Sequence, residues 1–255
     1  MTKSSYPNLT AVVLAGGKGT RMQSETPKVL HHIGQRPMVF YTLQKLLKLG
    51  IRDLKVVIGH KSQEVKSIIE ENFNCGFVFQ TEQLGTGHAL GCALKEINTN
   101  TKDILVVNGD DSAFYKEGTL QSFINFHKSS DAVVSMLTLE IETESKLGRV
   151  IRDKDGNFEK ILEANEYFNS PYKSNEINCG AYIFNYDWVK INITHIPISE
   201  KGEYYITELL NIAKQQDQKI NLFKLQDSNE WVGINTQEEL RNANLVFERV
   251  NTGSR

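Results

Sequence analysis

The stretch VVLAGGKGTRM at residues 12–22 joins an apolar run to a loop that is rich in glycine and positive charge. The apolar run is typical of a buried β-strand, and the glycines that follow mark its carboxyl end. Glycine lets backbone N–H groups surround an oxyanion, and ligands of α/β proteins bind at this edge of the sheet. The stretch therefore predicts an α/β fold with an anion-binding loop after its first strand.

The loop does not have the spacing of the common nucleotide-binding motifs. The P-loop pattern G-x-x-x-x-G-K-[ST] is absent, and G-x-G-x-x-G fails because Met22 stands at the third glycine. Lys18, Arg21 and Lys28 follow closely and could together neutralise a chain of phosphates. A flexible, solvated turn is the alternative interpretation of the same residues.

The composition is that of an ordinary globular protein: 255 residues, 40% of them hydrophobic and 24% charged, with a net charge of -2. This charge provides no broad basic surface for nucleic acid, and no apolar run is long enough to cross a bilayer. The first residues do not resemble a signal peptide, so a cytoplasmic location is expected. The length favours one domain over residues 1–255, with a small inserted lobe at roughly residues 140–200.

Short apolar runs alternate with amphipathic segments through the first half of the chain, which predicts a doubly wound, Rossmann-like mixed sheet. Residues 131–185 hold further β-rich runs, and DKDGN at residues 153–157 is a turn signal, so a small antiparallel β insertion is expected there. The helical pattern returns from Glu203. The last helix follows Asn235 and Thr236, either of which could cap it.

Two pairs of residues could suggest a metal site. Asp110 and Asp111 follow the apolar run ILVV, where acids serve as metal ligands or as ordinary turn residues. His31 and His32 lack a third ligand at a suitable spacing, so we assign them a structural role.

Several motifs occur in a characteristic order along nearly the whole chain: LAGGKGTRM, PKVLHHIGQRPM, QTEQLGTGHA, NGDD, LGRV, INCGA, GEYYITE and VGIN. In this order they resemble the sugar-1-phosphate nucleotidyltransferases, which implies a GT-A-like nucleotidyltransferase fold. QLGTGHA together with PKVLH resembles the branch that forms UDP-N-acetylglucosamine. That branch is the N-acetylglucosamine-1-phosphate uridylyltransferase domain of a bifunctional enzyme.

The resemblance implies which residues contact the nucleotide. Arg21 and Lys28 would meet the phosphates as catalytic residues, with Lys28 near the phosphate that is attacked. Gln80 would hydrogen-bond the uracil edge, since an amide has both a donor and an acceptor. The other implied nucleotide-binding positions lie in two segments: Leu14, Ala15, Gly16 and Gly17, then Gly85 and Thr86.

Mg2+ is the cofactor that the resemblance implies, held by Asp110 and by Asn235 of the VGIN motif. Magnesium takes few protein oxygens and completes its shell with water and substrate phosphate, so two such ligands suffice. One side-chain oxygen of Asn235 cannot serve both a metal and a helix cap, so Thr236 becomes the expected cap. Asp111 is assigned no ligand role.

The implied sugar-binding residues are scattered along the second half: Gly148, Glu163, Asn178, Glu203 and Tyr205. The chain departs from the family pattern in the same region, at Asn108, Ser112, Asn165, Cys179 and Glu208. An asparagine at 108 in place of the usual tyrosine, and at 165 in place of a lysine, changes what the pocket can stack on and hydrogen-bond. Nucleotide chemistry is therefore better supported than the identity of the sugar.

The implied reaction is attack of a sugar-1-phosphate oxygen on the α-phosphorus of a nucleoside triphosphate, which releases pyrophosphate. UTP and N-acetylglucosamine-1-phosphate are the expected substrates, no nucleic acid or membrane partner is expected, and the oligomeric state is left open. The alternatives are another sugar phosphate or nucleotide, a non-catalytic nucleotide-sugar-binding regulator, and a glycosyltransferase, although the D-x-D element of the last is absent at NGDD. Since no hexapeptide repeat follows, we expect no left-handed β-helix acyltransferase domain.

Overall fold

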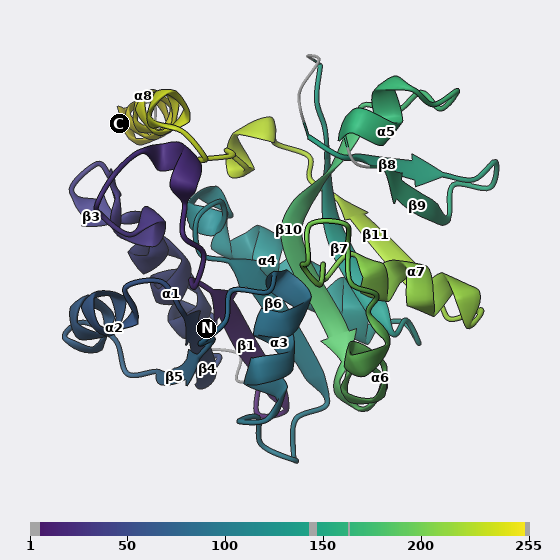
Figure 1. Cartoon of the computed structure of the whole chain (residues 1–255), viewed down its shortest axis with the longest axis horizontal. Helices are drawn as coiled ribbons and strands as arrows, with labels where there is room; N and C mark the ends of the chain where they lie inside the picture. The colour runs from purple at the N-terminus through teal and green to yellow at the C-terminus, as the bar shows by residue number, and fades with distance from the viewer. Residues whose placement is uncertain (1–5, 143–146, 163, 253–255) are drawn as a thin grey trace.

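The computed structural model describes residues 6–142, 147–162 and 164–252, and Figure 1 shows the chain. The strands are β1 (Leu9–Leu14), β2 (His32–Ile33), β3 (Arg36–Pro37), β4 (Asp53–Ile58), β5 (Gly76–Phe79), β6 (Asp103–Asn108), β7 (Val134–Glu140), β8 (Arg149–Arg152), β9 (Phe158–Leu162), β10 (Glu176–Asn185) and β11 (Ile220–Lys224). The α-helices are α1 (Met38–Lys48), α2 (Ser62–Glu70), α3 (Thr86–Leu94), α4 (Glu117–Lys128), α5 (Ala164–Phe168), α6 (Tyr186–Asn192), α7 (Glu208–Gln215) and α8 (Gln237–Thr252). No helix within the described residues is long and apolar enough to cross a membrane.

One mixed sheet forms the centre of the molecule, in the strand order β11-β7-β10-β6-β1-β4-β5. β1 pairs in parallel with β4 and β6, and β10 runs antiparallel to β6 and β7. The chain leaves β1 toward β4 on one side and returns to β6 on the other, which creates a topological switch point beside β1. The predicted doubly wound mixed sheet is confirmed, and ligands of such sheets bind outside the carboxyl ends of these strands.

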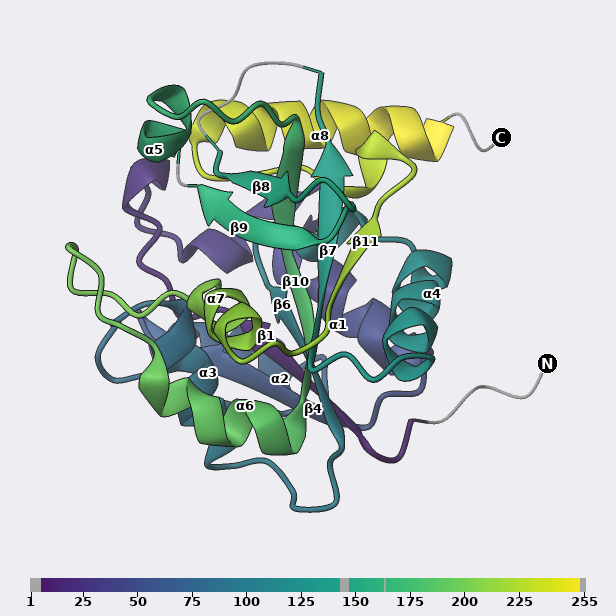
Figure 2. The same ribbon diagram turned by 90° about the vertical axis from the view of Figure 1, so that its right-hand side faces the viewer.

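Alternate residues of β1 face opposite sides of the sheet. Ala11 and Val13 lie in a core shared with α1, α2 and α4, whereas Val12 and Leu14 lie in a core shared with α3, α6 and α7. Figures 1 and 2 show these helices covering both faces of the sheet. Because both faces are buried, the central strands are continuous apolar runs rather than alternating ones.

β8 and β9 form the predicted antiparallel hairpin, which joins the sheet through the pairing of Arg149 with Ile177 of β10. Asp153 Oδ1 closes the predicted turn by accepting the backbone N–H groups of Asp155 and Asn157 at 2.9 and 2.8 Å. The hairpin and α5 form a small lobe, which Figure 1 shows at the upper right, across from α8 at the upper left.

The helix predicted from Glu203 begins only at Glu208. Backbone pairing holds the preceding residues in a different conformation: Tyr204 N–H donates to Leu84 O at 2.8 Å, and Tyr204 O accepts from Gly87 N–H at 2.7 Å. Backbone groups that are hydrogen-bonded to a distant segment cannot also form helical hydrogen bonds.

Helices α4 and α6 were not predicted. The signal for α4 is present in the sequence, because four of its residues are buried at helical spacing: Leu120, Phe123, Ile124 and His127. A 3-10 turn, Ser112–Phe114, separates the Asp110 turn from α4, whereas α6 follows directly on β10. Both helices cover the antiparallel half of the sheet, outside the alternating pattern of the first half of the chain.

Helix α8 packs on the segment that follows the glycine-rich loop. The Phe247 ring meets the Tyr41 ring edge to face, with centroids 5.3 Å apart, and Asn244 Oδ1 accepts the Gly34 N–H at 2.8 Å. A Cβ on Gly34, whose φ is +59°, would lie 2.7 Å from the Phe247 ring, so glycine is required there. These contacts hold α8, near the end of the described chain, against the segment around Gly34 and helix α1.

Candidate functional site

The loop after β1 is tied to the strands on both sides. Gly109 N–H donates to Leu14 O at 2.9 Å, which links β1 to the turn after β6. Ala15 N–H donates to Val57 O at 2.8 Å, which links it to β4. The two links fix the start of the predicted nucleotide-binding loop at the carboxyl edge of the sheet.

Two glycines of this loop have different surroundings. A Cβ on Gly16 would lie 3.1 Å from both Gly59 N and Gln80 Oε1, a tighter approach than most Cβ atoms tolerate. A Cβ on Gly17 would meet nothing within 4 Å, and Gly17 is exposed. Gly16 therefore permits close packing, whereas Gly17 leaves the loop backbone open to an incoming anion.

Four predicted phosphate and metal residues meet in one cluster: Arg21, Lys28, Asp110 and Asn235. Lys28 Nζ donates to Asn235 Oδ1 at 2.9 Å and forms a salt bridge with Asp110. Arg21 Nη2 donates to the same Asn235 oxygen at 2.9 Å. The Lys28 and Asp110 side chains are 13% and 25% exposed, so water screens this ion pair only in part.

The backbone between Arg21 and Lys28 explains how both cations reach the cluster. Gly19 has a φ of +59° and precedes the 3-10 turn Thr20–Met22, and Lys28 begins a second 3-10 turn, Lys28–Leu30. A Cβ on Gly19 would lie 2.8 Å from Lys28 Cβ, so the loop folds back closely on Lys28. Glycine at position 19 therefore lets the two turns pack side by side.

The cluster fits a divalent cation of the Mg2+ type. Asp110 offers a carboxylate oxygen and Asn235 an amide oxygen, and both are the hard ligands that Mg2+ takes from proteins. One ammonium, that of Lys28, contacts both residues, so their oxygens lie close enough to share one cation. Within residues 6–142, 147–162 and 164–252, no group of three or more histidine, cysteine or acidic residues is placed to hold a metal.

Thr236, and not Asn235, caps helix α8. Thr236 Oγ1 accepts the Glu239 N–H at 3.1 Å, and Glu239 Oε2 accepts the N–H groups of Asn235 and Thr236 at 2.6 and 3.0 Å. This reciprocal pair is a capping box, which satisfies the free N–H groups of the first helical turn. The expected cap at Thr236 is confirmed, and the Asn235 side chain faces Lys28 and Arg21 instead of the helix.

Gln80 lies at the end of β5, beside the glycine loop, and is 5% exposed. Its Nε2 donates to Gly85 O at 3.0 Å and lies 3.2 Å from His88 Nδ1. Gly85 has a φ of +95°, and a Cβ there would lie 2.6 Å from Tyr204 O. The predicted base-binding residues Gln80 and Gly85 are therefore in direct contact.

Thr86 and the segment of Glu203 and Tyr205 also lie together. Thr86 Oγ1 accepts the Ile206 N–H at 3.0 Å. Glu203 Cβ would lie 3.1 Å from a Cβ on Gly85. The structure thus joins Glu203 and Tyr205, which were predicted to border the sugar pocket, to the predicted nucleotide segment.

Two further predicted sugar residues, Gly148 and Asn178, lie toward the lobe. Asn178 lies at an irregularity of β10, where Asn178 Oδ1 accepts the Gly180 N–H at 2.9 Å and Asn178 Nδ2 donates to the Tyr182 hydroxyl. Gly148 directly precedes β8. Glu163 lies outside the described residues. A β-bulge of this kind redirects side chains beside a binding site.

Sequence reasoning did not foresee that Asn108 and Asp111 form a pair. Asn108 Nδ2 donates to Asp111 Oδ2 at 3.1 Å, while Asp111 Oδ1 is buried with no hydrogen-bond partner among the described residues. Burial and the charge of Asp110 raise the pKa of Asp111 well above its usual range. Asp111 is therefore engaged by Asn108 inside the turn, next to the Asp110 carboxylate.

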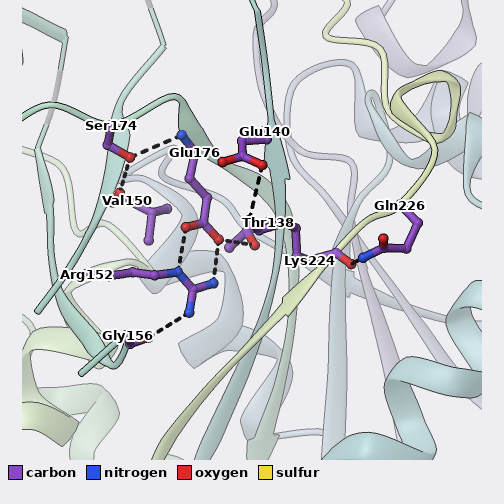
Figure 3. A network of polar contacts seen from close by, with 9 residues as sticks. All are labelled: Thr138, Glu140, Val150, Arg152, Gly156, Ser174, Glu176, Lys224 and Gln226. Carbon is purple, nitrogen blue, oxygen red and sulfur yellow. Dashed lines mark hydrogen bonds and ion pairs between the residues drawn. The ribbon is translucent and has the colours of Figure 1, made fainter. Parts of the chain in front are cut away.

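A second unforeseen group joins the lobe to the sheet, as Figure 3 shows. Arg152 of β8 makes two hydrogen bonds of 2.6 Å to the two carboxylate oxygens of Glu176 on β10, and Thr138 of β7 donates to Glu176 Oε1. Burial raises the pKa of Glu176, but the Arg152 and Thr138 hydrogen bonds and the Arg152 charge together hold it below its usual value. The ion pair therefore reinforces a hairpin that pairs with β10 at one residue pair.

A depression of about 370 Å3 lies at the opposite edge of the sheet, next to Asp103 and His127. His127 Nδ1 lies 2.7 Å from Ser135 Oγ, and His127 Nε2 lies 3.4 Å from Asp103 Oδ1. Ser135 is fully buried, so its hydroxyl cannot reach a substrate. This serine, histidine and aspartate are a structural bridge from α4 to β6 and β7, not a hydrolytic triad.

Comparison with curated proteins finds relatives of modest identity. The chain is 33% identical over 246 residues to the Bifunctional protein GlmU of Geotalea uraniireducens, across 96% of this chain and 54% of that protein. It is 35% identical over 243 residues to the Bifunctional protein GlmU of Streptococcus uberis, across 94% of this chain and 52% of that protein. The chain therefore spans about half the length of these curated relatives.

Comparison with solved structures supports the fold. A crystal structure from Bacillus anthracis that carries the name glucose-1-phosphate thymidylyltransferase, in complex with sucrose, matches with a TM-score of 0.78 and 20% identity, across 93% of this chain and 94% of that one. The sequence profile of the family described as Nucleotidyl transferase matches residues 10–249. The chain belongs to the nucleotidyl transferase family, and its predicted membership of the sugar-1-phosphate nucleotidyltransferases is confirmed.

Proposed function

We propose that the chain is a UTP-dependent sugar-1-phosphate uridylyltransferase, with N-acetylglucosamine-1-phosphate as its sugar substrate. The observation that carries the proposal is the contact of Lys28 with both Asp110 and Asn235, with Arg21 on the same Asn235 oxygen. Two cations beside two metal-type oxygen ligands, at the carboxyl edge of the sheet, suit a nucleoside triphosphate with a divalent cation.

The proposed reaction requires no nucleophile from the protein. An anionic oxygen of the sugar phosphate forms a bond to the α-phosphorus, the bond from that phosphorus to the bridging oxygen breaks, and pyrophosphate leaves with the electron pair. No proton has to be removed from the attacking oxygen. Arg21 and Lys28 would offset the negative charge of the phosphates, and the backbone at Gly17 would help to hold them in line.

Asp110 and Asn235 would hold the Mg2+ ion, which when bound neutralises phosphate charge and polarises the phosphoryl oxygens. The Lys28 ammonium contacts both residues. In the complex it would turn from these oxygens to the phosphates, which offer a stronger negative charge. Lys28 would thereby exchange a protein partner for a substrate partner.

The choice of N-acetylglucosamine-1-phosphate rests on the GlmU relatives, at 33% and 35% identity. One observation favours testing other sugar phosphates as well. Asn108, which departs from the family pattern, lies against Gly180 of β10, where a Cβ would be 2.2 Å from Asn108 Nδ2. The position of Asn108 under β10 gives this region a shape of its own.

The test is release of pyrophosphate from a panel of four nucleoside triphosphates, with UTP and dTTP among them, and several sugar-1-phosphates in the presence of Mg2+. We expect the highest kcat/KM with UTP and N-acetylglucosamine-1-phosphate. Higher kcat/KM with glucose-1-phosphate or with dTTP would replace the substrate assignment. No release with any pair, together with nucleotide-sugar binding by calorimetry, would favour the regulator over the enzyme.

A further inference from the structure

We propose that His88 is a positioning residue that orients the Gln80 amide, so that Gln80 accepts a hydrogen bond from the nucleotide base and donates none. The inference rests on the proposed function and extends it to the selection of the base. His88 would affect specificity through Gln80, without contacting the ligand itself.

The orientation of Gln80 follows from its two partners. Gln80 Nε2 lies 3.0 Å from Gly85 O and 3.2 Å from His88 Nδ1. A carbonyl oxygen can only accept, so the amide atom that faces Gly85 must be the nitrogen. The second N–H of the amide then points to His88 Nδ1, which must accept it.

The same contact determines the tautomer of His88. A ring nitrogen that accepts carries no proton, so the neutral imidazole carries its proton on Nε2. His88 Nε2 lies 3.8 Å from Cys92 Sγ, one helical turn further along α3, and a thiol sulfur is a weak acceptor. Burial raises the pKa of Cys92, which keeps that sulfur neutral. The row from Gln80 through His88 to Cys92 therefore has one consistent arrangement of hydrogens.

This arrangement leaves the amide oxygen of Gln80 for a ligand. Both amide hydrogens face protein acceptors, and Oε1 accepts no hydrogen bond from any residue that the structure describes. Oε1 lies 3.1 Å from the position of a Cβ on Gly16, at the edge of the predicted nucleotide loop. An acceptor held at this edge can receive a hydrogen bond from a base that carries N–H at the facing position.

An acceptor at Gln80 Oε1 distinguishes pyrimidine bases that carry a hydrogen on N3 from those that do not. Uracil and thymine carry a hydrogen on N3 and can donate it to Gln80 Oε1. N3 of cytosine is itself an acceptor, so its partial negative charge would face that of the amide oxygen and no hydrogen bond would form. A site built around a buried polar group discriminates strongly against a ligand that leaves the group unpaired. Without the acceptor at His88, one donor of a buried amide is unpaired, and the amide is held by Gly85 alone.

The test compares His88→Leu with His88→Asn, two side chains of similar outline. Asparagine places an acceptor, Oδ1, two bonds from Cβ as histidine places Nδ1, whereas leucine has none. The dissociation constants of UTP and CTP are measured by calorimetry on the full chain. We expect H88L to weaken UTP binding roughly tenfold and to lower the UTP:CTP affinity ratio, and H88N to keep both within about twofold.

Two further variants serve as controls, one for folding and one for a change elsewhere on the same helix. His88→Ala only removes atoms, so it replaces H88L if thermal unfolding shows that the leucine variant is not folded. Cys92→Ala alters the same face of α3 and keeps His88 Nδ1, so the affinity ratio should stay within about twofold of wild type. In all variants the KM of the sugar phosphate should be unchanged, because the side-chain hydrogen-bond contacts of His88 and Cys92 are with Gln80 and with each other, not with the predicted sugar residues.

The outcomes separate this inference from the proposed function. An unchanged UTP:CTP ratio in folded H88L or H88A, or an equal loss in H88N, overturns the role of His88. Equal affinity of the wild type for UTP and CTP also overturns it, even if pyrophosphate is released from UTP. Conversely, a wild type that prefers UTP in binding but releases no pyrophosphate fails the proposed function and leaves the role of His88 intact.

Discussion

The nucleotide side and the sugar side of the candidate site are held by different kinds of contact. On the nucleotide side, Lys28 ties the loop after β1 both to Asp110 after β6 and to Asn235 before α8, and Gln80 closes the segment after β5 by its hydrogen bond to Gly85. On the sugar side, the lobe joins β10 at one residue pair and through the Arg152–Glu176 ion pair. The nucleotide side is thus preorganised by the sheet edge, whereas the sugar side depends on how firmly an appended hairpin is held.

This difference predicts that substitutions on the two sides change different kinetic constants. Residues of the Lys28 cluster contact one another at the end of rigid parallel strands, so their loss should act on the chemical step. Residues that hold the lobe should act on the KM of the sugar phosphate, since they set the shape of one wall. The predictions below test this separation.

The largest effect is expected for Lys28→Ala, which should lower kcat by at least about a hundredfold because it removes a charge next to the reacting phosphate. Pyrophosphate release at saturating substrates measures the change. Lys66→Ala is the matched control, since Lys66 lies on α2, where it pairs with Glu70 and lies over the Phe77 ring. A kcat for Lys28→Ala close to that of the control would remove Lys28 from the mechanism.

Asp110→Asn should raise the Mg2+ concentration for half-maximal activity at least about tenfold, since it replaces a charged oxygen ligand with a neutral one. The titration of activity with Mg2+ measures this, and calorimetry with Mg2+ and UTP checks it without turnover. Asp227→Asn serves as the control, because Asp227 forms a surface ion pair with Lys116. Unchanged Mg2+ activation would refute the ligand assignment.

Arg152→Gln should raise the KM of the sugar phosphate roughly tenfold and leave the KM of UTP within about twofold, because only the lobe loses a support. It should also destabilise the fold by about 2 kcal/mol, as the carboxylate of Glu176 loses its partner in a largely buried place. Denaturant unfolding measures the second effect. An equal rise in both KM values would contradict the separation of the two sides.

The same ion pair predicts a pH dependence of stability. The pKa of Glu176 is lowered from its ordinary value of 4.5, so the ion pair contributes its full stability above about that pH and loses it as pH falls through the depressed pKa. The difference in unfolding free energy between wild type and Glu176→Gln should therefore be constant near neutral pH and shrink in the acid range. A difference that grows as the pH falls would have the wrong sign.

The smallest effect is expected for Thr236→Ala, which removes the side-chain cap of α8 and should cost about 1 kcal/mol of stability. For a chain of this size, that corresponds to a fall in Tm of about 2–4 °C. The Mg2+ requirement should not change, because the Asn235 side chain faces Lys28 and not the helix. A loss of Mg2+ affinity in this variant would show that cap and metal ligand are coupled.

Local sequence patterns were sufficient to predict those elements whose conformation depends on residues close together in the chain. The β1 strand and its glycine loop, the turn at residues 153–157 and helix α8 are where the sequence predicts them. Each of them depends on side-chain periodicity, glycine or a hydrogen bond within four residues. The start of α7 was predicted too early because Tyr204 pairs its backbone with residues 84–87, a contact that no local pattern contains.

By itself, the sequence determined that this chain has an α/β fold, a glycine loop after its first strand, and cations and acids suited to phosphate chemistry. Only the tertiary structure decided that Arg21 and Asn235, 214 residues apart, share one hydrogen bond, that Thr236 caps α8, and that both hydrogens of the Gln80 amide face the protein. The reason is physical. Residue type and spacing determine what a side chain can do, whereas its partner depends on which distant strand ends the sheet brings to the same edge.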